Sequence, residues 1–397
     1  MDNVIEMQSE KAAHVGYKQT EIGIIPEDWE VNPLEKYTMF VGSGKTNTKS
    51  KGTFPLFGST GQIGSCSNPE YHGDAILIAR VGANAGKLSF VSGQYGVSDN
   101  TIIVKLKPQN NIHFFKYWLT YKNLNSLVFG SGQPLITGTQ LKELLLPAPS
   151  INEQTAIANV LSDTDELITE FEKLIAKKQA IKTATMQQLL TGLTRLPQFS
   201  KHPDGAIKGY KSGELGHIPE DWEEREIGKF APLQRGFDLP ASKINEGLYP
   251  VVYSNGIANT HNHFQVQGPG VVTGRSGTLG KVHHIECNFW PHNTSLWVTR
   301  FINSDPKFVY YIFKYIGFER FASGSGVPTL NRNDAHSFKV AIPSSLKEQT
   351  AIATILSDMD TELTALERKL AKFLDIKQGM MQQLLTGRIR LPLEQQP

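Results

Sequence analysis

The chain has 397 residues, which at about 100–200 residues per domain corresponds to about two to four domains. Hydrophobic residues make up 39% and charged residues 20% of the composition, which excludes a wholly disordered or collagen-like chain. The net charge of +2 indicates no particular partner, and no apolar run reaches the roughly 18 residues that span a membrane. The polar first twenty residues lack the apolar stretch of a signal peptide. The two distant cysteines, Cys66 and Cys287, favour neither a disulfide scaffold nor a zinc finger, so we expect a cytoplasmic protein.

An internal repeat organises the chain. Identical segments recur at an offset of 195 residues, or of 193 residues near the N-terminus. They are EQTAIA at 153–158 and 348–353, MQQLLTG at 186–192 and 381–387, and IPEDWE at 25–30 and 218–223. Between these segments the two copies diverge. Duplication of one large unit explains this pattern, whereas a short-period solenoid does not.

The first copy begins after an N-terminal segment, residues 1–20. Residues 21–150 are rich in Gly, Asn, aromatic and β-branched residues, and apolar runs such as 75–79 and 101–104 lie between turns. Such runs predict strands, while residues 113–121 predict a helix. We therefore predict a mixed α/β globular domain.

Residues 151–192 are predicted to form one long helix, because neither Pro nor Gly interrupts residues 153–191. Apolar residues recur there at alternating spacings of four and three, which is typical of a coiled-coil seam. The predicted seam residues are Ile157, Leu161, Ile168, Phe171, Ile175 and Leu189. The residues that widen the apolar stripe are Val160, Leu167, Leu174 and Ile181. The polar residues that interrupt the seam are Thr164, Lys178, Lys182 and Thr185.

The second copy has the same order of parts. A linker at 193–213 precedes a second globular domain at 214–343, in which 270–273 predicts a strand and 307–318 a helix. A second long helix at 344–387 and a tail at 388–397 complete the chain. The seam residues of the second helix are Ile352, Leu356, Met359, Leu363, Leu366, Leu370, Phe373 and Leu384.

The two apolar stripes predict that the long helices pack against each other. Each helix of about 35–40 residues would be roughly 50–60 Å long. The sequence therefore predicts an α+β fold in which two homologous mixed α/β domains are separated by two long antiparallel coiled-coil helices, with a pseudo-twofold internal repeat. A four-residue insertion near Thr185 is then expected to lengthen the separation.

Positive charge is concentrated in the globular domains. Residues 36–147 contain 10 Lys and 1 Arg against 4 acidic residues, which gives +7. Residues 227–343 contain 6 Lys and 5 Arg against 6 acidic residues, which gives +5. The helices at 150–192 and 345–387 carry −2 and −1. Two basic domains on a mildly acidic spacer indicate a polyanion held at two places.

Both copies keep the pattern Arg–x–Gly…Gly–Lys after a predicted strand. The pattern fits a tight hairpin turn, or alternatively basic side chains that contact phosphates and base edges. A Gly-Ser-Gly segment near the end of each domain leaves the same alternatives of a turn or a phosphate contact open. The candidate DNA-binding residues in these and in neighbouring polar segments are Lys45, Lys49, Lys51, Arg80, Lys87, Gln133, Arg235, His261, Arg275, Lys281, Asn331 and Arg332.

Catalytic motifs are missing from the sequence. Residues 42–46 (GSGKT) resemble the end of a P-loop, but the position that requires its first Gly is Met39, and the second copy has QRGFD at 234–238. We expect a flexible Gly/Lys loop there, not a nucleotide site. His261 and His263 have no nearby set of ligands that would complete a metal site.

The order of these motifs resembles the specificity subunit of type I restriction–modification enzymes. The resemblance is carried by IPEDW at 25–29 and 218–222, by the Leu-Pro or Ile-Pro…Glu-Gln segments that open each helix, and by QQLLTG at 187–192 and 382–387. It covers about residues 17–392 and implies two target recognition domains, each reading half of a split, asymmetric DNA site. The long helices would space these domains and bind two adenine-N6 methyltransferase subunits.

The resemblance also implies that the chain is a non-catalytic subunit. Two restriction subunits, which supply the nuclease and translocase, would join the complex on double-stranded DNA, and S-adenosylmethionine, ATP and Mg²⁺ would belong to the partners. Two alternatives remain: a coiled-coil scaffold with two protein-binding heads, and a P-loop nucleotide hydrolase. The DNA sequence recognised cannot be read from the chain.

Overall fold

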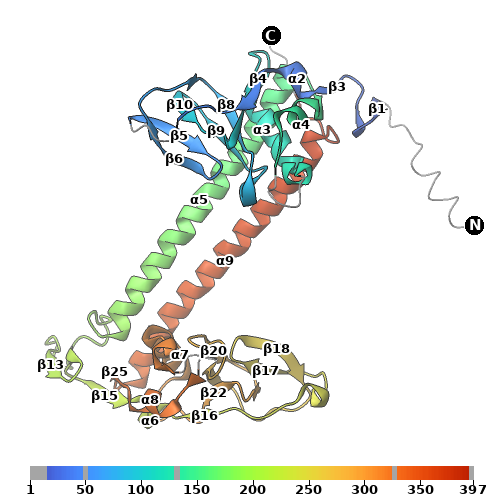
Figure 1. Cartoon of the computed structure of the whole chain (residues 1–397). Coiled ribbons are helices and arrows are strands. Elements are labelled where there is room, and N and C mark those ends of the chain that lie inside the picture. Colours follow the sequence, from blue (N-terminus) through green and yellow to red (C-terminus); the bar gives the residue numbers. More distant parts are fainter. Residues whose placement is uncertain (1–15, 48–51, 129–134, 324–328, 393–397) are drawn as a thin grey trace, which may run out of the picture. The chain divides into compact units, whose positions relative to one another are not determined.

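A computed structural model describes residues 16–47, 52–128, 135–323 and 329–392 (Figure 1). The chain divides into two compact units, residues 1–172 with 369–397, and residues 173–368. The two long helices, α5 (Ile151–Leu190) and α9 (Leu346–Leu385), each contribute one half to each unit. Each unit therefore contains one globular domain and two half-helices.

The globular domain of the first unit is built from short strands around helix α3. Its hairpin is β1 (Tyr17–Thr20) and β2 (Gly23–Pro26). Its other elements are β3 (Glu30–Pro33), α2 (Leu34–Tyr37), β4 (Thr38–Ser43), β5 (Phe54–Gly58), β6 (Gly61–Cys66), β7 (Tyr71–His72), β8 (Ala75–Ala79), β9 (Leu88–Val91), β10 (Gln94–Val97), β11 (Thr101–Leu106), α3 (Ile112–Tyr121), α4 (Gly138–Glu143) and β12 (Leu145–Ala148). The strands form sheets in the orders β4-β11-β8-β9 and β6-β5-β10-β7, and β12 pairs with β3.

The second unit repeats this architecture. Its elements are β13 (Tyr210–Gly213), β14 (Gly216–Pro219), β15 (Trp222–Glu226), α6 (Ile227–Phe230), β16 (Leu233–Arg235), β17 (Tyr249–Tyr253), β18 (Gly256–His261), β19 (Gly270–Gly274), β20 (Val282–Ile285), β21 (Trp290–Pro291), β22 (Ser295–Val298), α7 (Pro306–Ile316), β23 (Ala322–Ser323), β24 (Thr329–Leu330), α8 (Arg332–Ser337) and β25 (Lys339–Pro343). The sheets β16-β22-β19-β20 and β18-β17-β21 correspond to those of the first unit. The predicted α+β fold and internal repeat are confirmed.

The predicted domain borders are wrong at two equivalent places. The border after residue 20 falls inside the β1–β2 hairpin, and the border after residue 213 falls inside the β13–β14 hairpin. Each hairpin is closed by four residue pairs around a Gly with positive φ, Gly23 or Gly216. Strands of four residues with mixed polarity carry too little periodic signal to be recognised in the sequence.

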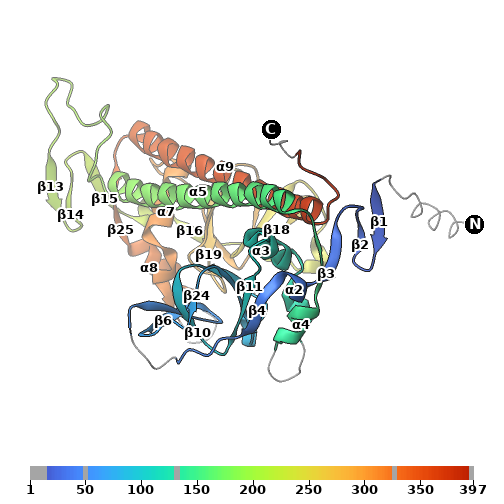
Figure 2. The ribbon, with the colours of Figure 1, turned by 90° about the horizontal axis from the view of Figure 1, so that it is seen from above.

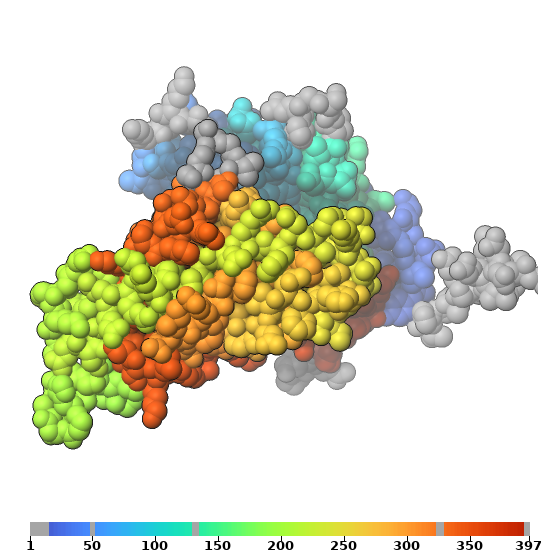
Figure 3. All heavy atoms as spheres, turned by 90° about the horizontal axis from the view of Figure 1, so that it is seen from below, coloured from blue at the N-terminus to red at the C-terminus, as the bar shows by residue number. Residues whose placement is uncertain are grey.

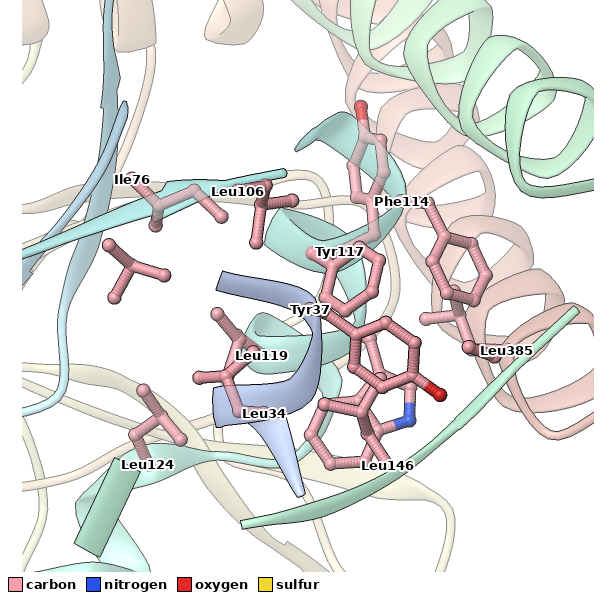
Figure 4. Close-up of a cluster of buried hydrophobic side chains, with 14 of the residues drawn as sticks. Leu34, Tyr37, Ile76, Leu106, Phe114, Tyr117, Leu119, Leu124, Leu146 and Leu385 are labelled. Carbon is pink, nitrogen blue, oxygen red and sulfur yellow. The ribbon is translucent and has the colours of Figure 1, made fainter. Parts of the chain in front are cut away.

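Each hydrophobic core includes side chains from both long helices. In the first unit Phe114 of α3 lies beside Leu385 of α9, as Figure 4 shows, and Tyr117 of α3 and Leu161 of α5 belong to the same cluster. The second core combines α7 with five buried residues of the long helices, Leu189, Leu190, Ile352, Ala353 and Leu356. Fully burying one such aliphatic side chain contributes about 1.5–3 kcal/mol. The half-helices are therefore integral parts of each unit.

The predicted seam is confirmed within each unit, where the half-helices run antiparallel (Figures 1 and 2). In the first unit Phe171 packs on Phe373, with ring centroids 5.1 Å apart. All predicted seam residues are buried or half-buried. The stripe is narrower than predicted, however, because Leu167, Leu174 and Ile181 are 42%, 38% and 43% exposed. These three residues lie on the outer side of α5, which neither core covers.

Lysines within the seam form ion pairs with acidic residues of the opposite helix. In the second unit Lys178 lies 2.7 Å from Glu362, and the nearly buried Lys182 pairs with Asp360. In the first unit Lys377 lies 2.5 Å from Asp165. The three lysines of the seam therefore each have a carboxylate partner on the opposite helix, and the one that is buried, Lys182, is not left as an uncompensated charge.

Candidate nucleic-acid interface

Arg80 and Arg275 occupy equivalent places at the ends of β8 and β19. The backbone of Arg80 donates to Asn100 O (2.9 Å) and that of Arg275 donates to Thr294 O (2.9 Å). The carbonyl of each arginine in turn accepts a hydrogen bond, from Ile136 in one unit and from Leu330 in the other. The backbones of both arginines therefore make the same hydrogen bonds at the ends of equivalent strands, and both side chains are half-buried.

The pattern Arg–x–Gly…Gly–Lys forms the hairpin connection after each of these strands. Four glycines in the two connections have positive φ, namely Gly82, Gly86, Gly277 and Gly280. A side chain is disfavoured in this conformation, which explains the Gly spacing. Lys87 and Lys281 end the connections and are exposed. The turn interpretation is therefore confirmed, and the turn still presents one Lys per unit to solvent.

A polar cluster surrounds the arginine of the second unit. Arg235 Nη2 donates to Asp238 Oδ1 (3.1 Å), and Asn293 Nδ2 donates to the same oxygen. Arg275 Nη1 lies 3.5 Å from Asn293 O. The guanidinium of Arg235 and the carboxylate of Asp238 are exposed, and the amide of Asn293 is half-buried. These three groups can each recognise a different base edge, namely guanine, cytosine and adenine. We call these four residues the second-unit polar cluster.

Aromatic and polar side chains extend this surface along β17 and β18. Tyr253 packs against His292 with ring centroids 4.3 Å apart, and its hydroxyl accepts from Asn259 Nδ2 (3.1 Å). Asp238, Asn293, Tyr253 and His292 were absent from our candidate list. None of the identical repeated segments contains them, because they lie in the diverged part of the second copy. Figure 3 shows the globular domain of the second unit, coloured yellow to orange.

The first unit has different side chains at the same positions. Arg80 Nη1 donates to Ser43 Oγ (3.3 Å), and the strand registers make Ser43 the counterpart of Arg235. Asn100 is likewise the counterpart of Thr294. This follows because the next residue, Thr101, pairs with Ala79 in the first unit, as Ser295 pairs with Gly274 in the second. Asn100 and Asn293 are therefore not equivalent, although both are asparagines near the same strand. Asn293 itself corresponds to Asp99.

The P-loop-like segment is built into the sheet. Strand β4 ends at Ser43, and a Cβ on Gly44 would lie 2.2 Å from Val97 O. The buried Thr46 hydroxyl donates to Glu70 Oε2 (2.9 Å) and accepts from Val97 N (3.0 Å). These contacts contradict the predicted flexible loop at Gly44 and Thr46 and leave no P-loop geometry. Among residues 42–46, only Lys45 is exposed.

Several other candidates have their places fixed by the structure. His261 is only 5% exposed and its ring bonds to the backbone of Asn245, so its assignment as a base reader is wrong. The Asn331 side chain caps helix α8 by accepting from Asn333 N (3.0 Å). Arg332 is exposed. The remaining candidates, Lys49, Lys51 and Gln133, lie outside the described residues.

The repeated motifs meet in one ion-pair network per unit, which is buried in the second unit and partly exposed in the first. In the second unit Arg195, which follows α5, donates to Glu348 (2.7 and 2.9 Å) and to Asp221 (2.8 and 3.1 Å). Burial raises the pKa of Glu348 even though Arg195 opposes it. Burial also acts to raise the pKa of Asp221, but hydrogen bonds from Arg195 and Lys208 outweigh it and lower this pKa.

The first unit contains the matching network. Arg390, which follows α9, donates to Glu153 (2.5 and 2.7 Å) and to Asp28 (2.9 Å twice). The hydrogen bonds from Arg390 lower the pKa of Asp28. The IPEDW and EQTAIA motifs and the residues after each QQLLTG segment are therefore parts of one junction. This arrangement explains why the motifs occur in the same order in both copies.

A second network joins each globular domain to both long helices. Tyr117 Oη donates to Asp165 Oδ2 (2.7 Å), whose other oxygen lies 2.5 Å from Lys377. Burial raises the pKa of Tyr117 to about 12, so its hydroxyl stays a donor. In the second unit Tyr311 donates to Asp360 (2.7 Å), which also pairs with Lys182.

Comparisons with known proteins agree with this duplicated architecture. The family described as type I restriction modification DNA specificity domain matches residues 26–183 and 219–374. The chain belongs to this family of specificity subunits. A putative type I restriction enzyme specificity subunit (MjaX) of Methanocaldococcus jannaschii is 28% identical, covering 94% of this chain and 97% of the relative. The EcoprrI specificity subunit of Escherichia coli is 34% identical over 124 residues, which cover 30% of this chain and 31% of the relative.

The fold of this specificity subunit is also found among solved structures. The type I restriction–modification S subunit of M. genitalium superposes with a TM-score of 0.64 at 20% identity, covering 90% of this chain and 96% of that chain. Within the described ranges no helix is long and apolar enough to cross a membrane, and no group of His, Cys, Asp or Glu side chains could hold a metal ion.

Acid is expected to destabilise the second unit of the specificity subunit between pH 6.5 and 5. Burial lowers the pKa of four histidines in this unit, His283, His284, His292 and His336. The neutral histidines stabilise the folded unit at pH values above about 6.5, which is the pKa of histidine in the unfolded chain. At lower pH this stabilisation is lost, because the unfolded chain binds more protons than the folded unit. Amide hydrogen exchange measured for each unit at pH 7 and pH 5 tests this prediction.

His336 provides the matched variant for this experiment. Its Nε2 accepts a hydrogen bond from Leu233 N (2.8 Å), which a protonated ring cannot do. A glutamine oxygen remains an acceptor at pH 5, so His336→Gln is expected to reduce the acid sensitivity. Equal acid sensitivity of the variant and the wild type would contradict the assignment to His336.

Proposed function

We propose that the chain is the sequence-specific DNA-binding specificity subunit of a type I restriction–modification complex. Each unit reads one half of an asymmetric, bipartite double-stranded DNA site. The observation that carries this proposal is the pair of equivalent surface positions with different side chains, Ser43 and Arg80 in one unit and the second-unit polar cluster in the other. The same backbone frame with different donors and acceptors suits two different half-sites.

The chain itself performs no chemistry in this proposal. The long helices set the spacing of the half-sites and dock two adenine-N6 methyltransferase subunits. Two restriction subunits complete the nuclease and translocase, and S-adenosylmethionine, ATP and Mg²⁺ are bound by the partners. The complex acts in the cytoplasm. Basic residues on each globular domain hold the phosphate backbone, so affinity is expected to fall as salt rises.

A methylome tests the proposal directly. The chain is expressed with the methyltransferase encoded beside it in a host without DNA methylation, and N6-methyladenine is mapped by long-read sequencing. One bipartite motif, methylated on both strands, is expected. A stable complex that methylates nothing, combined with no salt-dependent DNA binding, would favour the alternative of a scaffold with two protein-binding heads.

Arg275→Ala is expected to relax recognition of one half-site only. Loss of an arginine contact to a base costs about 1–3 kcal/mol, or roughly 5- to 150-fold in discrimination. Competition binding with single-base variants of both half-sites measures the effect, and Arg300→Ala, an exposed arginine of the same unit, is the control. Unchanged discrimination at every base would show that Arg275 does not read DNA.

A further inference from the structure

Each unit contains a pocket at the same place in its architecture. In the second unit a pocket of about 690 Å³ lies between the β13–β14 hairpin, the end of α5, the last turn of α7 and β25. In the first unit a pocket of about 220 Å³ lies between the β1–β2 hairpin, the end of α9, the last turn of α3 and β12. We call them the hairpin grooves.

Equivalent residues line the two grooves. The matching pairs are Ile22 with Leu215, Ile25 with Ile218, Tyr121 with Tyr315, Pro147 with Ala341, and Thr386 with Thr191. The first groove is smaller because Trp118 and Lys122 stand where the second unit has Ile312 and Ile316. The grooves are thus two copies of one feature.

The same hydrogen bonds hold the two hairpins. Tyr17 Oη donates to Gly387 O (3.2 Å), and Tyr210 Oη donates to Gly192 O (3.0 Å). Lys18 and Lys211 each donate to a glutamate carbonyl of the following IPEDW motif, at 2.7 and 2.8 Å. Because each hairpin is tied to the end of a long helix, the grooves are fixed features of the units.

The grooves have an apolar floor, exposed apolar rims and cations. Ile24 and Tyr121 are 48% and 39% exposed in the first unit, and Leu215 and Tyr315 are 45% and 43% exposed in the second. Two cations also line each groove, Lys122 and Arg388 in the first, Arg320 and Lys339 in the second. Lys339 also forms an ion pair with Glu214 (2.6 Å), so Arg320 is the main candidate for a partner carboxylate in the second groove. Exposed aliphatic and aromatic side chains around a concave surface indicate a protein partner, and the cations complement carboxylates.

We propose that the two hairpin grooves bind the same amphipathic, acidic helical segment of the methyltransferase subunit, one copy in each groove. This inference rests on the proposed function and assigns its docking surface. Two equivalent grooves fit a partner that is present in two copies. The DNA-binding surfaces of the two units, by contrast, differ from each other, as two different half-sites require. The apolar rims favour a protein segment over DNA, which would meet a mainly polar surface.

Stoichiometry tests the proposal. The chain is co-expressed with the methyltransferase encoded beside it, and native mass spectrometry counts the subunits. Ile24→Asp with Tyr121→Asp, or Leu215→Asp with Tyr315→Asp, is expected to reduce the complex from two methyltransferases to one, and all four changes to none. Leu248→Asp, at a position that is 89% exposed, is the control and keeps two. The salt-dependent DNA affinity of each variant chain alone should match that of the wild type, which excludes unfolding.

Photo-crosslinking supplies an independent result. A benzoylphenylalanine at position 121 and another at position 315 are expected to capture the same methyltransferase peptide. Variants that still bind two methyltransferases, crosslinks to DNA, or crosslinks to a second copy of this chain would overturn the docking assignment alone. A wild-type chain that binds no methyltransferase would instead overturn the proposed function, and this inference with it.

Discussion

Arg195→Ala is expected to destabilise the second unit by about 3–5 kcal/mol, because it leaves a buried carboxylate without its cation. The Arg195 and Glu348 side chains are 7% and 2% exposed, and two hydrogen bonds join them. Asp221 loses its hydrogen bonds from Arg195 at the same time but keeps its ion pair with Lys208 (2.7 Å). The largest rise in hydrogen exchange is expected at residues 346–356, where α9 begins.

Two further variants separate the charge effect from loss of packing. Glu348→Gln in the Arg195→Ala background removes the uncompensated charge and should restore a substantial part of the stability. Arg388→Ala is the control. Arg388 is exposed and occupies the position that Leu193 has in the other copy, so its loss should change the free energy of unfolding little. Equal stability of Arg195→Ala and Arg388→Ala would show that the junction network does not stabilise the unit.

The sequence predicted those features of the fold that depend on a regular spacing of apolar residues or on identical repeated segments. The long helices, their seam and the duplicated frame all follow from heptads and identical motifs. The reason for those motifs was not predictable, since Arg195 meets Glu348 only after the chain folds back over 153 residues. The ion pairs of Lys182 and Lys377 were likewise hidden, because their identification needs the register of two helices.

The candidate site was predicted in part. Arg80 and Arg275 hold equivalent, half-buried positions, as the repeated pattern suggested. His261 was misjudged because alternation along a strand does not show which face is buried. Asp238 and Asn293 were missed because their meeting depends on a contact between strand ends that are far apart in sequence.

Inserting one heptad into each long helix is expected to lengthen the gap between the half-sites and to leave both half-site sequences unchanged. Seven residues add about 10 Å of helix, which corresponds to about three base pairs. The structure shows that Thr185 is a poor place for such an insertion, because Leu189 and Leu190 belong to the core of the second unit. Suitable points are after residue 172 in α5 and after residue 368 in α9, where the units divide.

Copies of residues 166–172 and 369–375 provide insertions that keep the helical faces. With both present, Phe171 still faces Phe373 in the first unit and Lys178 still pairs with Glu362 in the second. An insertion in α5 alone shifts the two helices relative to each other, so that these contacts cannot all form. This control variant should fail to assemble the methyltransferase complex. Methylome sequencing measures the gap of the methylated motif. An unchanged gap with the double insertion would exclude a spacer role for the helices, whereas altered half-site sequences would exclude independent reading by the two units.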